Sequence, residues 1–304
     1  MKDVFCFRVP EQKRVRMIVD TDCKNEADDQ FALAHHLMTP MLEVKGIVAA
    51  HFENGRPDYR GRSMQASFDE IERVLDLMDL RGKYPVLKGC AKPLPDQRTP
   101  VESEGARFIV AEALRDDPRP LFVALQGAIT DLASALLMEP SIKDRLTAIW
   151  IGGDRYPNGG WEFNLAQDIC AANVVFASGV ALWQVPKNVY KLMNVSLAEL
   201  QHRVAPCGDI GAYLVKQMVE LNDSLGDAPW PHGETWCLGD QPTVGVLLED
   251  RERENYTMQK APIVQPDCTY APRPDAHEIR VYDSVDVRLI LEDFYAKMAL
   301  LFGS

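Results

Sequence analysis

Short apolar runs separated by helix-length segments are the feature that most constrains the fold of this chain. The runs at residues 15–19, 44–50, 84–88, 121–125, 147–151 and 180–185 are rich in aliphatic and β-branched residues, as buried strands are. Segments with helical spacing lie between them, at 27–38, 64–78, 102–114, 130–138 and 168–177. Helix-length connections join parallel strands through right-handed crossovers. The alternation therefore predicts an α/β fold, a doubly wound, mostly parallel sheet with helices on both faces.

The last third of the chain departs from this alternation. Helical patterns at 209–222 and 240–248 precede a polar segment with short strands at 256–264 and 279–282, and a helix is expected at 285–302. No linker-like change of composition and no internal repeat divides the sequence, so we expect a single domain, residues 1–304, with C-terminal elaborations. The stretch 226–239, which contains Pro and Gly, is expected to form a long loop near a cleft.

The charge balance limits the range of partners. Asp plus Glu is 45 and Lys plus Arg is 33, a formal net charge of −12 with no basic stripe to offset it, so nucleic acid is not expected as a partner. No apolar run approaches the roughly 18 residues that suggest a membrane span, so we expect no membrane contact and a cytoplasmic location. The seven cysteines form no C-x-x-C pair, which favours reduced thiols.

Four aspartates crowd the turn after the first predicted strand. Asp20 and Asp22 follow the apolar run directly, and Asp28 and Asp29 stand at the start of the next helix. In open α/β sheets ligands collect at the carboxyl ends of the strands, where this turn falls. Capping by Asn25 and the attraction of acids to a helix N-terminus explain only the second pair.

Converging carboxylates at this turn imply a bound cation. Two unit charges about 4 Å apart repel by roughly 4 kcal/mol at an effective dielectric of 20, so they need a cation or a shared proton. An irregular set of oxygen ligands suits Ca²⁺ better than strictly octahedral Mg²⁺. The pattern therefore predicts a Ca²⁺ site.

Four ordered blocks of this sequence resemble the inosine-uridine-preferring nucleoside hydrolases. The family's DTDPGxDDAxAL reads DTDCKNEADDQFAL here, and its TGxLTNLAxAL reads LQGAITDLASAL at 125–136. Its AEFNxxxD reads WEFNLAQD at 161–168, and its HDPxAV reads GDQPTV at 239–244. The resemblance implies Ca²⁺-dependent hydrolysis of the N-glycosidic bond of a ribonucleoside or related N-riboside, giving ribose and free base. It also implies a homodimer or homotetramer.

The resemblance assigns the metal ligands and the base. It gives the cation the carboxylates of Asp22, Asp29 and Asp240 and the backbone carbonyl of Gln126. Asp22 is also implied as the base for the attacking water, while Asp20 is expected to support the loop.

The resemblance assigns the substrate contacts as well. Ribose hydroxyls are implied to bind Asp28, Glu162 and Asn164, with Asn158 as a further contact and Asp240 beside them. Cleavage of an N-ribosidic bond passes through an oxocarbenium-like sugar. Nearby negative charge and hydroxyl contacts therefore stabilise the transition state more than the ground state.

Two departures from the family pattern affect this site. Asp22 and Asp28 are six positions apart, whereas the family spaces them by four, so the loop is two residues longer. The family's histidine that protonates the leaving base is replaced by Gly239. Candidates to replace it lie in the preceding loop, and we expect substrate contacts from His232 and Trp236, with Glu234 and Trp230 as further possibilities.

Two other functions share part of this pattern. A haloacid-dehalogenase-like phosphatase also begins with an apolar strand and DxD, but Lys24 stands where Thr or Val is expected. The other alternative is a non-catalytic ribose- or nucleoside-binding descendant of the family that keeps the metal and lacks an acid at position 239.

Overall fold

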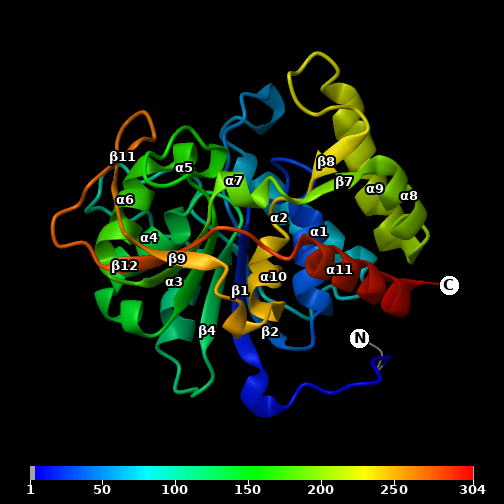
Figure 1. Cartoon of the computed structure of the whole chain (residues 1–304), viewed down its shortest axis with the longest axis horizontal. Helices are drawn as coiled ribbons and strands as arrows, with labels where there is room; N and C mark the ends of the chain where they lie inside the picture. Colours follow the sequence, from blue (N-terminus) through cyan, green and yellow to red (C-terminus); the bar gives the residue numbers. More distant parts are fainter. Residues whose placement is uncertain (1–3, 304) are drawn as a thin grey trace.

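An eight-stranded sheet forms the centre of the computed structural model, which describes residues 4–303 (Figure 1). Its strands are β1 (Val15–Thr21), β2 (Leu42–Ala49), β3 (Val86–Lys88), β4 (Leu121–Leu125), β5 (Thr147–Ile151), β6 (Ala181–Val185), β9 (Tyr256–Lys260) and β12 (Glu278–Tyr282). They lie in the order β3-β2-β1-β4-β5-β6-β12-β9, and only the β12–β9 pair is antiparallel. The prediction of a doubly wound, mostly parallel sheet is confirmed, with C-terminal strands extending one edge.

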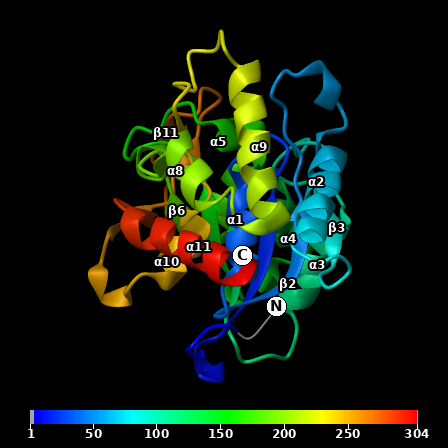
Figure 2. The same ribbon diagram turned by 90° about the vertical axis from the view of Figure 1, so that its right-hand side faces the viewer.

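Helices cover both faces of the sheet (Figures 1 and 2). One face packs against α1 (Asp29–Met38), α2 (Ser63–Leu77), α10 (Pro242–Leu248) and α11 (Val287–Phe302). The other face packs against α3 (Glu104–Ala113), α4 (Thr130–Met138) and α6 (Ile169–Ser178). Helix α9 (Gly208–Ser224) contacts α2 and α11 from outside.

Shorter elements connect these layers. The helices are α5 (Phe163–Gln167), α7 (Lys187–Tyr190) and α8 (Leu197–Arg203), with 3-10 turns η1 (Glu11–Lys13), η2 (Pro57–Tyr59), η3 (Pro140–Asp144) and η4 (Arg251–Arg253). Strands β7 (Asn194–Ser196) and β8 (Thr235–Cys237) form one antiparallel pair. Strands β10 (Ile263–Val264) and β11 (Tyr270–Ala271) form another.

The apolar character of the central strands follows from burial on both faces. In β1, Met17 and Val19 belong to one core cluster, whereas Ile18 belongs to the other. A strand covered on both sides needs apolar side chains at successive positions, which is the run that the sequence shows. Within residues 4–303 no helix combines the length and apolar character needed to cross a membrane.

The element boundaries differ from the expected ones at the acidic turn. Strand β1 continues to Thr21, so Asp20 lies inside the sheet. Helix α1 begins at Asp29 with Asp28 as its N-cap residue, so Asn25 does not cap it. The expected strand at 256–264 is divided into β9 and β10.

Candidate active site

A cavity of about 460 Å³ lies at the carboxyl ends of the central strands. It is located where the strand order reverses between β1 and β4, the place where doubly wound sheets bind ligands. The polar residues that line it are Asp22, Asn25, Glu26, Asp28, Asp29, Asn54, Arg56, Gln126, Glu162, Asn164, Lys187, Tyr190, Lys191 and Asp240.

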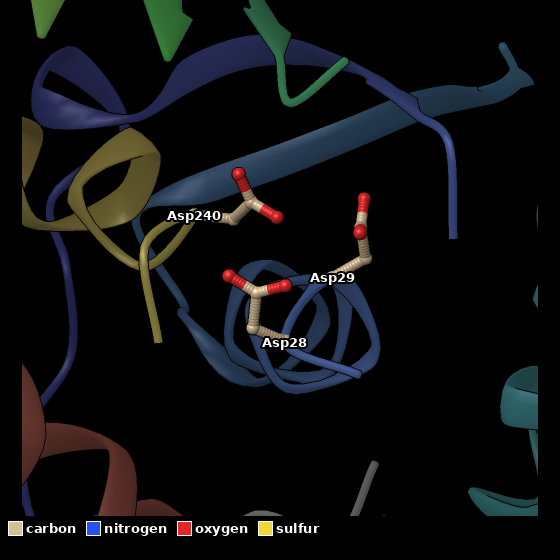
Figure 3. A group of neighbouring side chains, drawn as sticks. All are labelled: Asp28, Asp29 and Asp240. Carbon is tan, nitrogen blue, oxygen red and sulfur yellow. The ribbon is translucent and has the colours of Figure 1, made fainter. Parts of the chain in front are cut away.

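Three carboxylates converge inside this cavity (Figure 3). Asp28, Asp29 and Asp240 each offer an oxygen within 4.8 Å of the others. The hydroxyl of Thr21 donates to Asp29 Oδ1 at 2.5 Å, and the amide of Gly239 donates to Asp28 Oδ2 at 2.8 Å. The end of β1 and the turn before α10 therefore hold the start of α1 in place.

Asp22, from the turn after β1, lies beside Asp29, although it is not one of the three residues whose oxygens lie within 4.8 Å of one another. Its side chain is buried, and its Oδ2 atom has no hydrogen-bond partner among residues 4–303. The carboxyl group lies against Gly127, where an added Cβ would be 2.7 Å from Asp22 Cγ. Only a glycine leaves room for this carboxylate. We call Asp22, Asp28, Asp29 and Asp240 the acidic floor.

Gln126 presents its backbone beside the acidic floor. Its amide donates to the carbonyl of Asp20 at 2.9 Å, which continues the pairing of β1 with β4. Its carbonyl accepts a 2.9 Å hydrogen bond from Asn164 Nδ2, and the second lone pair of a carbonyl can bind another ligand. Its side-chain amide donates to Thr243 Oγ1 at 3.1 Å. Through these contacts, Gln126 connects the end of β4 with α5 and α10, and its backbone carbonyl is held in a fixed position.

Burial controls the protonation of the acidic floor. Burial raises the pKa of Asp28 to about 6, and burial together with the charge of Asp28 raises the pKa of Asp29 to about 7. For Asp22 and Asp240, burial and then the neighbouring carboxylates raise the pKa well above its usual value. The floor therefore retains protons near neutral pH unless a cation replaces them. Its all-oxygen donor set and the unpartnered Asp22 oxygen fit a hard divalent cation.

Glu162 organises the wall formed by α5. Its Oε2 atom accepts hydrogen bonds from the amides of Gly153 at 2.8 Å and Leu165 at 2.9 Å. Its Oε1 atom accepts from the amide of Asn164 at 3.1 Å and from the hydroxyl of Tyr190 at 2.9 Å. The carboxylate thus caps α5 and holds Tyr190 at the same time.

Asn164 is held rigidly by its amide nitrogen. Nδ2 donates to the carbonyls of Gln126 and Ile151, both at 2.9 Å. Among the described residues no hydrogen-bond partner is found for its Oδ1 atom, which remains available in the cavity. The side chain therefore offers one fixed acceptor to a ligand.

Comparison with known proteins assigns the chain to a family. The model of the family "Inosine-uridine preferring nucleoside hydrolase" matches residues 17–288. The chain belongs to this family. The enzyme class is therefore that of the N-ribohydrolases, and a phosphatase or a non-catalytic binding protein is not favoured.

Named relatives of this hydrolase include several ribonucleoside hydrolases. The pyrimidine-specific ribonucleoside hydrolase RihA of Salmonella arizonae is 27% identical over 257 residues, 75% of this chain and 78% of the relative. The purine-preferring ribonucleoside hydrolase of Gardnerella vaginalis has a TM-score of 0.74 at 18% identity, with 94% and 98% of the two chains covered. The type III effector XopQ, solved with adenosine diphosphate ribose, has a TM-score of 0.69 at 16% identity, covering 95% and 94%.

The geometry brings together most of the residues expected at the site of this hydrolase. Those that line the cavity are Asp22, Asp28, Asp29, Gln126, Glu162, Asn164 and Asp240. Asp20 is not part of the lining. Its carboxyl group is buried with neither oxygen hydrogen-bonded within residues 4–303, and burial, then the charge of Asp131, raises its pKa.

Three expected substrate contacts lie away from the cavity wall. Asn158 is exposed, and its carbonyl accepts a hydrogen bond from the Tyr270 amide at 2.9 Å, so its loop folds onto β11. His232 is exposed in the loop before β8 and does not line the cavity. Trp236 is buried and does not line the cavity, whereas its neighbour Cys237 does; the indole of Trp236 packs behind Trp230, with 5.4 Å between the ring centres. The geometry does not support these three assignments.

Tyr190 occupies the space beside Gly239. A Cβ at position 239 would lie 3.0 Å from Tyr190 Cδ2 and 3.4 Å from Asp28 Oδ2. A side chain at this position requires Tyr190 to move, so the glycine and the tyrosine form a matched pair. The family's histidine therefore cannot be restored by a single substitution without disturbing this wall.

Aromatic and cationic side chains form the entrance of the cavity, and the sequence interpretation missed most of them. Trp161 is 61% exposed and Trp230 is 43% exposed. Lys187 and Lys191 follow β6, so the rule that functional residues follow parallel strands would have found them. We call these four residues the mouth.

Glu26 lies in the longer loop between Asp22 and Asp28, and it also lines the cavity. Burial and the charge of Asp28 raise its pKa to about 8, although Lys191 opposes the shift. The loop is anchored by Gln30, whose Nε2 atom donates to the carbonyl of Cys23 at 2.6 Å. The two extra residues thus add a carboxyl group to the cavity.

Proposed function

We propose that this protein hydrolyses the N-glycosidic bond of a ribonucleoside or related N-riboside in a Ca²⁺-dependent reaction, giving ribose and free base. The observation that supports this most is the convergence of buried carboxylates at the strand-order reversal, in a chain of the nucleoside hydrolase family. Asp22, Asp29, Asp240 and the carbonyl of Gln126 would hold the cation. When bound, the cation would polarise a water molecule and offset the charge of the acidic floor.

The chain's own residues supply the remaining steps. Asp22 accepts the proton of the attacking water. Asp28 and the fixed Oδ1 atom of Asn164 accept hydrogen bonds from ribose hydroxyls, while Glu162 positions Asn164 and Tyr190. The negative charge of the floor stabilises the positive charge that develops on the sugar, and these contacts tighten in the transition state.

A panel of substrates tests this function. Purified protein is incubated with purine and pyrimidine nucleosides and nicotinamide riboside, with calcium or with chelator, and reducing sugar and free base are measured. We expect release in calcium and none in chelator. Release from no compound would contradict the proposal, and calcium-dependent binding without release would support the non-catalytic alternative.

A pair of variants connects the activity to the site. Asp240→Asn should lower turnover more than about 100-fold and weaken calcium binding, because it removes a proposed ligand. Asp144→Asn removes the same charge from an exposed position in η3. This turn precedes β5 and therefore lies at the amino ends of the strands, away from the cavity, so the variant should keep both properties.

The remaining expectations belong to the same proposal. We infer that the chain works as a single domain, residues 1–304, because the proposed ligands come from segments between residues 22 and 240 that meet around one central sheet. A homodimer or homotetramer, a cytoplasmic location, and the absence of nucleic acid and membrane partners remain predictions from the sequence. Light scattering of the purified protein tests the oligomeric state.

A further inference from the structure

The cavity has acidic side chains in its floor and positively charged side chains at its mouth. The acidic floor is buried, whereas the ammonium groups of Lys187 and Lys191 stand at the entrance beside the exposed indoles of Trp161 and Trp230. In a chain of net charge −12, two lysines at the mouth of an acidic cavity form a local cationic patch. Such a patch attracts an anion that the rest of the protein would repel.

Lys191 offers a free positive charge at this mouth. Its side chain is exposed, and no carboxylate oxygen lies within 4.0 Å of its ammonium group in residues 4–303. The ammonium is 5.7 Å from the ring centre of Tyr190 and 6.0 Å from that of Trp230. It therefore stands among aromatic surfaces that line the same cavity, without a salt bridge within 4.0 Å, while the carboxyl groups of Glu26 and Asp28 act on its charge from farther away.

Lys187 is fixed in position by its own contacts. Its ammonium donates to the carbonyl of Trp161 at 3.0 Å and lies 5.6 Å from the centre of that indole ring. The nearest carboxylate oxygen, Asp154 Oδ2, is 3.9 Å away, beyond hydrogen-bond distance. An ammonium carries three hydrogens, so Lys187 retains donors for a ligand.

We propose that the mouth binds an anionic substituent of the N-riboside, with Lys187 and Lys191 as its cationic partners. The exposed indoles add apolar surface on which a heterocycle can stack. This inference rests on the proposed function, because it names the class of N-riboside that the same site takes. Two positions on such a substrate can carry the charge: a carboxylate on the base, or a phosphate on the 5′ oxygen.

Binding measurements test this substrate class without relying on turnover. Quenching of tryptophan fluorescence is followed in calcium buffer with three compounds: uridine, uridine 5′-monophosphate and orotidine, which carries a carboxylate on the base. We expect at least one anionic compound to bind about tenfold more tightly than uridine, with an advantage that shrinks as salt is raised. The compound that gains identifies the position of the charge. Equal or weaker binding of both anionic compounds overturns the proposal.

Lysine variants assign the effect to the mouth. Lys191→Gln and Lys187→Gln should each remove most of the advantage of the anionic compound over uridine. Lys260→Gln serves as the matched control, since Lys260 is exposed on the edge strand β9 and its loss changes the net charge by the same amount. An advantage that survives in the double variant, or that falls equally in Lys260→Gln, overturns the assignment.

The outcomes separate this inference from the proposed function. Hydrolysis of uridine together with no preference for anionic compounds would leave the function standing and reject the inference. A lysine-dependent preference for an anionic compound without release of sugar from any substrate would support the inference and reject the hydrolytic function.

Discussion

The acidic floor and the mouth of the cavity are built in different ways. The floor side chains stand at a strand end and at helix starts, are buried, and are held by donors such as Thr21 and Gly239. The mouth side chains stand on loops and on the short helix α7, and both of its tryptophans are exposed. In the proposed mechanism, the residues around the sheet therefore hold the reacting groups, whereas the connecting segments contact the substrate. Changes in the floor should therefore affect metal binding and turnover, and changes in the mouth should affect substrate affinity.

The largest effect is expected from Gly127→Ala in the floor. The new Cβ would approach Asp22 Cγ to 2.7 Å, so the carboxylate must move away from its proposed ligand position. We expect kcat to fall more than about 100-fold and calcium binding to weaken, with a loss of stability of about 1–3 kcal/mol from overpacking. Kinetics and calorimetric calcium titration measure the changes in kcat and in calcium affinity, and thermal unfolding measures the loss of stability.

Gly55→Ala is a control for the loss of a glycine outside the floor, because nothing lies within 4 Å of an added Cβ there. Because φ at this position is 75°, an alanine there is strained, so the variant also controls for a general loss of stability. Normal calcium affinity in Gly127→Ala would show that Asp22 is not a ligand.

Acid should weaken calcium binding to the floor by about 100-fold between pH 7 and pH 5. With the pKa of Asp29 near 7, the ion must displace a proton at lower pH, which costs up to about tenfold in affinity per pH unit for each proton. Calcium titration in buffers of increasing acidity checks this. An affinity that is independent of pH would contradict a site made of these carboxylates.

The same pKa shifts make the stability of the metal-free protein depend on pH. Asp28 and Asp29 have folded-state pKa values of about 6 and 7, above the usual value of 3.8 for an aspartate. Between the usual pKa and these raised pKa values, the folded state therefore binds more protons than the unfolded state. Their contribution to stability is present below about pH 4 and is lost as pH rises through 6 and 7. Thermal unfolding in chelator should therefore show the floor losing stability toward pH 8, and calcium should restore it.

A smaller effect is expected from Glu162→Gln, in the wall that connects floor and mouth. An amide cannot accept all four hydrogen bonds that the carboxylate accepts, so the start of α5 and Tyr190 become less ordered. We expect kcat/KM to fall about tenfold, with calcium affinity nearly preserved. Glu139→Gln is the matched control, since Glu139 also caps a helical turn, at η3. Equal losses in both variants would indicate a general effect on stability.

The smallest effect is expected in the mouth, from Trp230→Ala. Loss of an exposed indole removes stacking surface and should raise KM about threefold to tenfold, with a smaller change in kcat. Phe7→Ala removes another exposed aromatic ring that does not line the cavity. A large fall in kcat for Trp230→Ala would break the distinction between floor and mouth.

Part of the floor could be predicted from the sequence, because Asp22 directly follows a strand and Asp28 and Asp29 stand at the start of the next helix. The carboxyl ends of parallel strands lie at the same end of the sheet, which explains why Asp22 lies near Gln126, although Gln126 itself was assigned through the family resemblance. Asp240 was found through its motif, since no rule of local structure places the turn before α10 against α1. The alternation of strands and helices was sufficient to predict a doubly wound, mostly parallel sheet, but not the order of its strands.

The mouth could not be predicted in the same way. Loop 226–239 contains two tryptophans, and the choice between Trp230 and Trp236 depends on strand β8, which is too short to show a pattern in the sequence. The position of Asn158 depends on the contact between its loop and β11, more than 100 residues later. Such contacts follow from tertiary packing and leave no local signal.

A crystal structure of the protein grown in calcium tests the central claim most directly. The expected result is an ion in the acidic floor with oxygen ligands at about 2.3–2.6 Å from Asp22, Asp29, Asp240 and the carbonyl of Gln126. An empty floor at saturating calcium, or an ion bound without Asp22 and Asp240, would contradict it.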